Sequence, residues 1–178
     1  MKNPKTPRIK TQKVCDLMAT VYLSLGGNMG NRDEYLAGAR GAIETAFPGV
    51  RFSGVYETEP VDFLDQPWFL NQVAEIQTDW TPESLLEWAR SLEERFGRQR
   101  NIPKGPRTLD IDILLYDHQI LTGATLTLPH PELLNRRHVL VPLAELASDK
   151  MLPVGQMTIG QALKNVKDRS QVKLHASS

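Results

Sequence analysis

The segment that most constrains the fold is residues 109–116, Leu-Asp-Ile-Asp-Ile-Leu-Leu-Tyr. Acidic and aliphatic residues alternate at its start, which is typical of a β-strand, because successive side chains of a strand point to opposite faces of the sheet. Asp110 and Asp112 therefore share one face, while the other face carries only aliphatic side chains. The chain must fold so that helices bury the aliphatic face and the acidic face keeps a polar environment.

Two carboxylates on one strand face repel each other unless positive charge lies near them. A hard divalent cation such as Mg²⁺ supplies that charge, and phosphate oxygens and water commonly complete its coordination shell. Two aspartates on a solvated surface are the alternative interpretation. The strand pattern alone leaves both interpretations open.

The segment before this strand is rich in cations and contains no acidic side chain between residues 95 and 107. Guanidinium groups form paired hydrogen bonds that match the oxygens of a phosphate. A basic run is often only a solvated surface, but this one leads directly into a candidate metal pair. Together they predict a site for a polyphosphate with its magnesium, as phosphoryl transfer requires. The cations are Arg95, Arg98, Arg100, Lys104 and Arg107.

The remaining patterns follow the order strand, helix, strand, strand, helix, strand. This order predicts an α+β fold, a ferredoxin-like βαββαβ sandwich with two helices on one sheet face and the other face free for a site. An added hairpin and short C-terminal helices are expected after it. The predicted strands are 21–25, 50–56, 68–78 and the acidic strand, the helices are 31–47 and 81–96, and the additions are a strand at 126–128 and helices at 138–147 and 158–167.

Length and composition indicate one soluble domain. The chain has 178 residues and a formal net charge of zero, so no overall field favours nucleic acid or membrane as a partner. Cys15 is the only cysteine, which excludes an internal disulfide and favours a reducing, cytoplasmic location. No segment has the apolar length of a membrane helix. We expect a flexible basic leader at 1–20, the domain at 21–170 and a tail at 171–178.

Five segments, in order along residues 20–165, resemble the family of 6-hydroxymethyl-7,8-dihydropterin pyrophosphokinases of folate biosynthesis. The resemblance implies an enzyme that transfers pyrophosphate from ATP to the hydroxymethyl group of the pterin and releases AMP. The block Gly-Pro-Arg-Thr-Leu-Asp-Ile-Asp is the most specific of the five. The segments are YLSLGGNMGNR at 22–32, DQP and FLN within 65–71, GRQR at 97–100, GPRTLDIDIL at 105–114, and PHP at 129–131 with VLVPL at 139–143.

The resemblance implies that Asp110 and Asp112 hold two Mg²⁺ ions that bridge the triphosphate and the incoming hydroxyl. Arg98 and Arg107 are then catalytic as well as ATP-binding. Glu93 matches a helix glutamate near the nucleotide, although a solvated surface acid is an equal alternative. The full set implied for ATP is Glu93, Arg98, Arg100, Arg107, Thr127, His130 and Arg136.

A pterin is flat and needs an aromatic platform beside a side chain that both donates and accepts hydrogen bonds. Phe69 and Asn71 lie on one face of the predicted strand, and they match the stacking aromatic and the pterin-binding asparagine of the family. Core packing is the alternative for Phe69. The implied pterin set also includes Thr58 to Val61, and His138, which replaces the second stacking aromatic, commonly Phe.

Four positions depart from the family pattern. His138 brings a titratable group to a stacking position, Lys104 replaces a common Trp, Arg90 replaces a common Gln, and Gly27 replaces a frequent Ser. Because the metal aspartates and phosphate arginines are retained, we expect activity with altered affinity.

ATP and the pterin are the expected partners of a monomer, without nucleic acid or membrane. Contact with dihydropteroate synthase, the next enzyme of the pathway, is left open. Two other functions were weighed. A nucleic-acid-binding module also combines aromatics with cations, but the adjacent carboxylates would repel a phosphate backbone. A two-metal nuclease would need a further carboxylate cluster near this pair.

Overall fold

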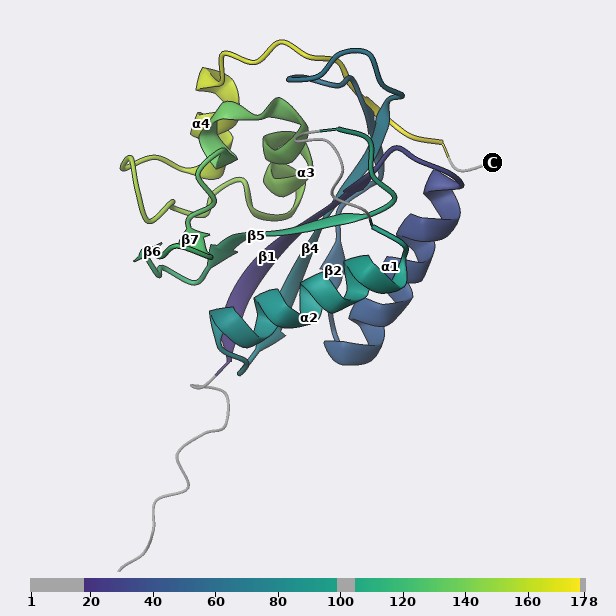
Figure 1. Ribbon diagram of the computed structural model, residues 1–178. Coiled ribbons are helices and arrows are strands. Elements are labelled where there is room, and N and C mark those ends of the chain that lie inside the picture. Colours follow the sequence, from purple (N-terminus) through teal and green to yellow (C-terminus); the bar gives the residue numbers. More distant parts are fainter. Residues whose placement is uncertain (1–17, 99–104, 177–178) are drawn as a thin grey trace, which may run out of the picture.

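A six-stranded antiparallel sheet forms the centre of the protein, as the computed structural model of residues 18–98 and 105–176 shows (Figure 1). The strand order is β5-β1-β4-β3-β8, and β2 also pairs with β4. The predicted α+β βαββαβ order is confirmed, with the first and third strands of the pattern in the middle. The strands are β1 (Ala19–Gly27), β2 (Arg51–Phe52), β3 (Tyr56–Thr58), β4 (Phe69–Thr78), β5 (Asp110–Tyr116) and β8 (Val172–Leu174).

Helices α1 (Arg32–Ala46) and α2 (Pro82–Arg95) cover one face of the sheet (Figure 1). Each begins at a side-chain cap: the Asn31 side chain accepts from the backbone N–H of Glu34, and Thr81 accepts from that of Ser84. Helix α2 packs on the aliphatic side of β5, as predicted, and α1 packs on the same sheet face against β1 and β4. Buried residues of this core include Leu36, Ala39 and Ile43 of α1, Leu85, Ala89 and Leu92 of α2, and Leu109, Ile111 and Ile113.

The opposite face is not free along its whole length, which corrects the prediction. Helices α3 (Arg137–Ala147) and α4 (Ile159–Asn165) cover part of it through a second apolar core. The alternation of β5 breaks at Leu114, where the register with β1 shifts in a β-bulge. Strand residues beyond that point are therefore apolar on this side too. The second core includes Tyr22, Val73, Leu114, Leu115, Leu140, Leu143 and Ile159.

The predicted hairpin is formed by β6 (Leu121–Thr122) and β7 (Thr127–Leu128), followed by the short helix η2 (Leu133–Asn135). The predicted strand 50–56 is divided into β2 and β3, and two segment boundaries differ from the expectation. Strand β1 begins at Ala19, inside the expected leader, and the expected tail contains β8, which pairs with β3. The edge of β3 exposes backbone N–H and C=O groups. A short segment such as β8 can form hydrogen bonds with them regardless of its side chains, so the side-chain pattern did not predict this strand. Residues 1–17 of the leader and residues 177–178 lie outside the described residues.

The end of β1 and the turn that follows it pack against the segment before β5, and the close approach at Gly26 and Gly27 is possible only for glycine. A Cβ atom on Gly27 would lie 2.2 Å from the carbonyl oxygen of Thr108, and one on Gly26 would lie 2.4 Å from Oδ1 of Asn71. The backbone N–H of Asn28 then donates to the carbonyl of Arg107 at 2.9 Å. The predicted role of this turn, close approach of another segment, is confirmed.

Gly27→Ala is expected to lower the free energy of unfolding by about 2 kcal/mol or more, because backbone atoms of Thr108 cannot move aside cheaply. Gly41→Ala is the matched control, since nothing lies within 4 Å of a Cβ there. In the middle of α1 it should stabilise the protein by up to about 1 kcal/mol. Urea unfolding of both variants checks this, and equal stabilities would contradict the close approach.

Candidate functional site

Two adjoining pockets lie at the end of the sheet that α3 and α4 leave uncovered. We call the first the Phe69 pocket; it is lined by Thr58, Glu59, Pro60, Val61, Asp62, Gln66, Phe69, Asn71, Arg107, Arg136 and His138. We call the second the aspartate pocket; its lining includes Arg90, Glu93, Arg98, Asp110, Asp112, Thr127 and His130. Every predicted site residue that the structure describes therefore lines one of the two pockets.

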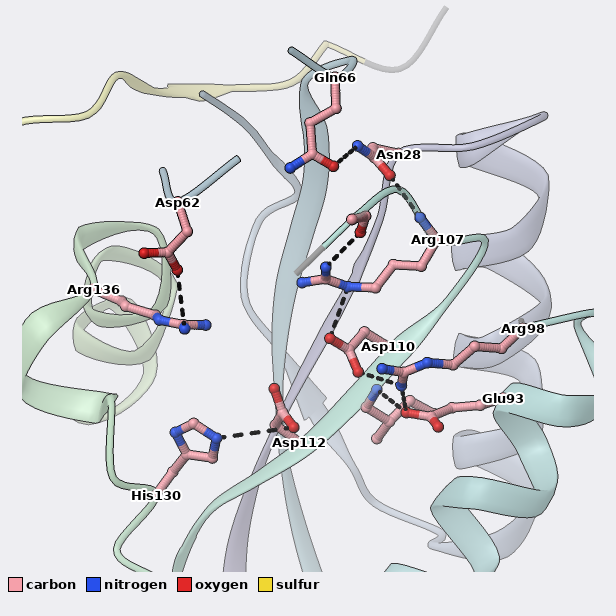
Figure 2. A network of polar contacts seen from close by, with 12 residues as sticks. Asn28, Asp62, Gln66, Glu93, Arg98, Arg107, Asp110, Asp112, His130 and Arg136 are labelled. Carbon is pink, nitrogen blue, oxygen red and sulfur yellow. Dashed lines mark hydrogen bonds and ion pairs between the residues drawn. The ribbon is translucent and has the colours of Figure 1, made fainter. Parts of the chain in front are cut away.

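An ion pair connects the two pockets. Nε of Arg107, from the Phe69 pocket, lies 2.8 Å from Oδ2 of Asp110, in the aspartate pocket. The guanidinium of Arg107 also lies over the ring of Phe69, at 4.8 Å from its centroid. Arg107 thus contacts both an acidic group and an aromatic platform, and a group passing from one pocket to the other would pass beside it (Figure 2).

Asp110 and Asp112 lie on the same face of β5, as predicted, but their surroundings differ (Figure 2). The Asp110 carboxylate is paired on one oxygen with Arg98 and on the other with Arg107. The side chain of Asp112 is 42% exposed, and Nε2 of His130 lies 3.9 Å from its carboxylate. Partial burial and the Asp110 charge raise the pKa of Asp112. Asp112 therefore carries the less compensated charge of the two.

Glu93 is a buried acid and not a surface one, so the solvated alternative for this residue is wrong. Its exposed fraction is 3%. One carboxylate oxygen accepts the backbone N–H of Ile111 at 2.8 Å and pairs with Arg98. Because Arg98 also pairs with Asp110, a chain of alternating charges runs from α2 onto β5. The strand that bears the aspartates is thereby held to the helix that precedes the basic segment.

His130 has a defined hydrogen-bonding role. The ring Nδ1 of His130 accepts the backbone N–H of Glu132 at 3.2 Å, and the backbone N–H of His130 donates to the carbonyl of Leu114 at 2.9 Å. In the neutral ring the proton is then on Nε2, the nitrogen that faces Asp112. His130 therefore presents a donor to the aspartate pocket.

Polar and aromatic groups meet in the Phe69 pocket. The side-chain amide of Asn71 donates to Oγ1 of Thr58 at 2.6 Å, between residues that are 7% and 1% exposed. Phe69 is 8% exposed and lies on the same face of β4. Arg136, implied as an ATP contact, lines this pocket and lies 3.6 Å from Asp62. The pocket therefore places the flat ring of Phe69 beside the Asn71 amide, with the guanidinium of Arg107 over the ring.

Asn28 is a site-building residue that the sequence reasoning did not single out. It is 3% exposed, and its amide nitrogen donates to Oε1 of Gln66 at 3.0 Å and to the carbonyl of Pro67 at 2.9 Å. Its amide oxygen accepts the backbone N–H of Arg107 at 2.9 Å. Asn28 thus ties the loop before β4 to the segment that carries Arg107. The signal in the sequence is an asparagine directly after paired glycines, a pattern that predicts only a turn.

Some predictions fall outside the described residues, among them Arg100 and Lys104. Within the described residues, no group of three or more His, Cys, Asp or Glu side chains is placed to hold a metal ion. The helices of the same residues are too short or too polar for any of them to span a bilayer.

Comparison with known proteins decides the family. The family model for 7,8-dihydro-6-hydroxymethylpterin-pyrophosphokinase matches residues 22–148. The pyrophosphokinase of Haemophilus influenzae is 39% identical over 160 residues, which cover 89% of this chain and 99% of the relative. That of Methylorubrum extorquens is 43% identical over 149 residues, covering 82% and 92%. The chain belongs to this family. It is accordingly a diphosphokinase enzyme of folate biosynthesis.

Other relatives of this pyrophosphokinase are larger. The folic acid synthesis protein fol1 of Pneumocystis carinii is 37% identical over 90% of this chain, which spans only 22% of that protein. A solved structure of Plasmodium falciparum HPPK-DHPS is 15% identical with a TM-score of 0.67, and covers 83% of this chain and 45% of its own. The latter likeness shows the fold, which is therefore the fold of the family.

His138 is expected to make the stability of this pyrophosphokinase pH-dependent. Burial, with Arg136 nearby, lowers the pKa of His138 from 6.5 to about 4. Between these values the unfolded chain binds a proton that the folded chain does not, so the free energy of unfolding falls as pH falls from 6.5 to 4. The total contribution is roughly 3 kcal/mol.

His138→Phe should remove this contribution. Urea unfolding of both proteins at pH 7 and pH 4.5 checks it, with the pH 7 difference subtracted as the baseline. The variant should lose less stability than the unchanged chain on acidification. An equal loss in the two proteins would show that the folded state does not hold His138 neutral.

Proposed function

We propose that the aspartate pocket binds ATP with magnesium, and that the Phe69 pocket binds 6-hydroxymethyl-7,8-dihydropterin. The reaction would transfer the pyrophosphoryl group to the hydroxymethyl oxygen and release AMP. The observation that carries this assignment is the Arg107–Asp110 ion pair, because it joins the acidic pocket to the aromatic one at 2.8 Å. A phosphate chain and a flat acceptor held in these pockets would meet beside it.

Asp110 and Asp112 are the residues proposed to hold two Mg²⁺ ions. Their donor set fits this cation, since Mg²⁺ is usually bound through one or two carboxylates while water and substrate phosphates fill its other positions. When bound, the metal would neutralise charge on the phosphate oxygens and orient the attacking hydroxyl. Asp112, which is partly exposed and weakly paired, is the more accessible of the two carboxylates.

The two arginines paired with Asp110 are proposed to shift their ion pairs to the triphosphate. Arg98 and Arg107 pair with Asp110 in the structure, and a guanidinium can exchange a carboxylate oxygen for a phosphate oxygen with little change in geometry. Arg100 would add a further cation. Glu93 would hold Arg98 in place, and the remaining ATP contacts would come from Thr127, His130 and Arg136.

In the Phe69 pocket, the ring of Phe69 is proposed to stack on the pterin while Asn71 binds its polar edge. An amide both donates and accepts hydrogen bonds, as that edge requires. Thr58 orients Asn71 through the 2.6 Å hydrogen bond. The loop from Thr58 to Val61 and the ring of His138 would complete the walls.

Association with dihydropteroate synthase is a second proposal. It is supported by the Plasmodium falciparum HPPK-DHPS protein, whose name joins the two enzymes. Size-exclusion chromatography of the two separate proteins, alone and mixed, tests it. A shared earlier-eluting peak supports association, whereas unchanged elution of both contradicts it.

Turnover with ATP, Mg²⁺ and 6-hydroxymethyl-7,8-dihydropterin should yield AMP and pterin diphosphate in equal amounts. Asp112→Ala should lower kcat by about 10³-fold or more, because phosphate charge is then poorly neutralised, while circular dichroism shows a folded protein. Asp149→Ala, which removes an exposed acid elsewhere, is the control and should keep full activity. Normal turnover by Asp112→Ala would rule out its metal role.

Phe69→Leu should raise the KM for the pterin about 10-fold and leave the KM for ATP unchanged, because a ring-stacking contact is lost at similar side-chain volume. Phe52→Leu is the matched control: Arg40 lies over its ring at 4.7 Å, as Arg107 lies over Phe69, but it does not line either pocket. Steady-state kinetics of both variants check this. Equal effects at the two positions would contradict a pterin platform at Phe69.

A further inference from the structure

The segment after α4 contacts two walls of the Phe69 pocket, although it lies beyond the residues 22–148 that the family model matches. It consists of Asp168, Gln171 and β8, and we call it the C-terminal clamp. Its two contacts are independent of each other. One reaches the first turn of α3, and the other reaches the loop that follows β3.

The first contact caps α3 at its N-terminus. The residue at the N-cap position is Arg136, which makes no side-chain cap hydrogen bond. Oδ2 of Asp168 instead accepts the backbone N–H of Arg137 at 2.8 Å, from a position 31 residues along the chain. A carboxylate there satisfies a free donor and is favoured by the helix dipole. Arg136 and His138, the two neighbours of Arg137, both line the Phe69 pocket.

Asp168 is itself held in place. Its other oxygen accepts the backbone N–H of Ser170 at 2.8 Å. Burial alone would raise the pKa of Asp168, but the N–H groups of Ser170 and Arg137 outweigh it and lower that pKa. The carboxylate therefore stays charged at neutral pH, which is the form that caps a helix most strongly.

The second contact holds the loop on the other side of the pocket. The backbone N–H of Glu59 donates to the carbonyl of Gln171 at 3.0 Å, and the N–H of Gln171 donates to the Glu59 carboxylate at 3.0 Å. One residue earlier, Thr58 is paired with Val172 of β8. Thr58 is the hydrogen-bond partner of Asn71, so the clamp also reaches the polar edge of the pocket.

We propose that Asp168 is a positioning residue for the pterin: by capping α3 it sets where Arg136 and His138 stand opposite the Phe69 platform. The inference rests on the proposed function of the Phe69 pocket. It adds a residue outside the matched family segment to the determinants of pterin binding. The capped helix end, not contact with substrate, is what Asp168 contributes.

The test removes first the acceptor of the capping hydrogen bond, Asp168, and then its donor, the backbone N–H of Arg137. Asp168→Ala should raise the KM for the pterin roughly 10-fold. The KM for ATP should rise less than about threefold, because Arg136 is one of several proposed ATP contacts and the others do not depend on the capped end of α3. Asp168→Asn, which keeps an oxygen acceptor suited to capping, should restore most of the pterin affinity. A purely structural role would lower stability without separating the two KM values.

Arg137→Pro deletes the N–H that Asp168 accepts, and proline is well tolerated at the first position of a helix. Arg136 already has the extended backbone that precedes a proline, with φ −119° and ψ 110°. This variant should raise the pterin KM as Asp168→Ala does. Arg137→Ala, which keeps the N–H, should not. Arg137→Pro and Arg137→Ala together test whether the cap affects pterin binding, even if Asp168→Ala fails to fold.

The outcomes are distinct. Unchanged pterin KM in both Asp168→Ala and Arg137→Pro, or equal rises in the two KM values, would overturn the positioning role alone. Absence of any AMP formation by the unchanged, folded chain would overturn the proposed function, and this inference with it.

Discussion

The architecture of the site depends on the contact between the glycine pair that ends β1 and the segment that enters β5. Without side chains at Gly26 and Gly27, the backbone of residues 107–108 and the Asn71 side chain come within distances that no Cβ would permit. Asn28 then fixes the backbone of Arg107 by hydrogen bonds in both directions. Because Arg107 connects the two pockets, this close packing fixes the position of the Phe69 pocket relative to the aspartate pocket.

Charge balance is the second organising feature. At the aspartate pocket, Glu93, Arg98, Asp110 and Arg107 form a chain of alternating charges, while Asp112 faces the ring of His130 (Figure 2). Buried charges are tolerated when each has partners, and here only Asp112 is left with a distant one. A polyphosphate bound with a divalent metal would add negative and positive charge together, so it could be accommodated without leaving the arginines unpaired.

The residues that match the family model and the C-terminal clamp are different parts of the molecule. The matched residues 22–148 contain both pockets, and most of the sheet and the cap-bearing end of α3 belong to them. The C-terminal clamp lies outside this range but supplies the cap of α3 and the edge strand beside β3. A short C-terminal segment can thus shape a site to which it contributes no lining side chain.

By itself, the sequence determined the features that depend on local periodicity and residue chemistry. Alternation placed Asp110 and Asp112 on one face of a strand and Phe69 with Asn71 on another, and helical spacing identified the stripes of α1 and α2. Only the tertiary structure decided which distant groups meet. In the site, it buries Glu93, pairs Arg98 and Arg107 with Asp110, and joins two segments through the hydrogen bonds of Asn28. In the sheet, it covers part of the second face and pairs β8 with β3. These depend on contacts between residues far apart in the chain, which no local pattern encodes, and on backbone hydrogen bonds, which are common to all side chains.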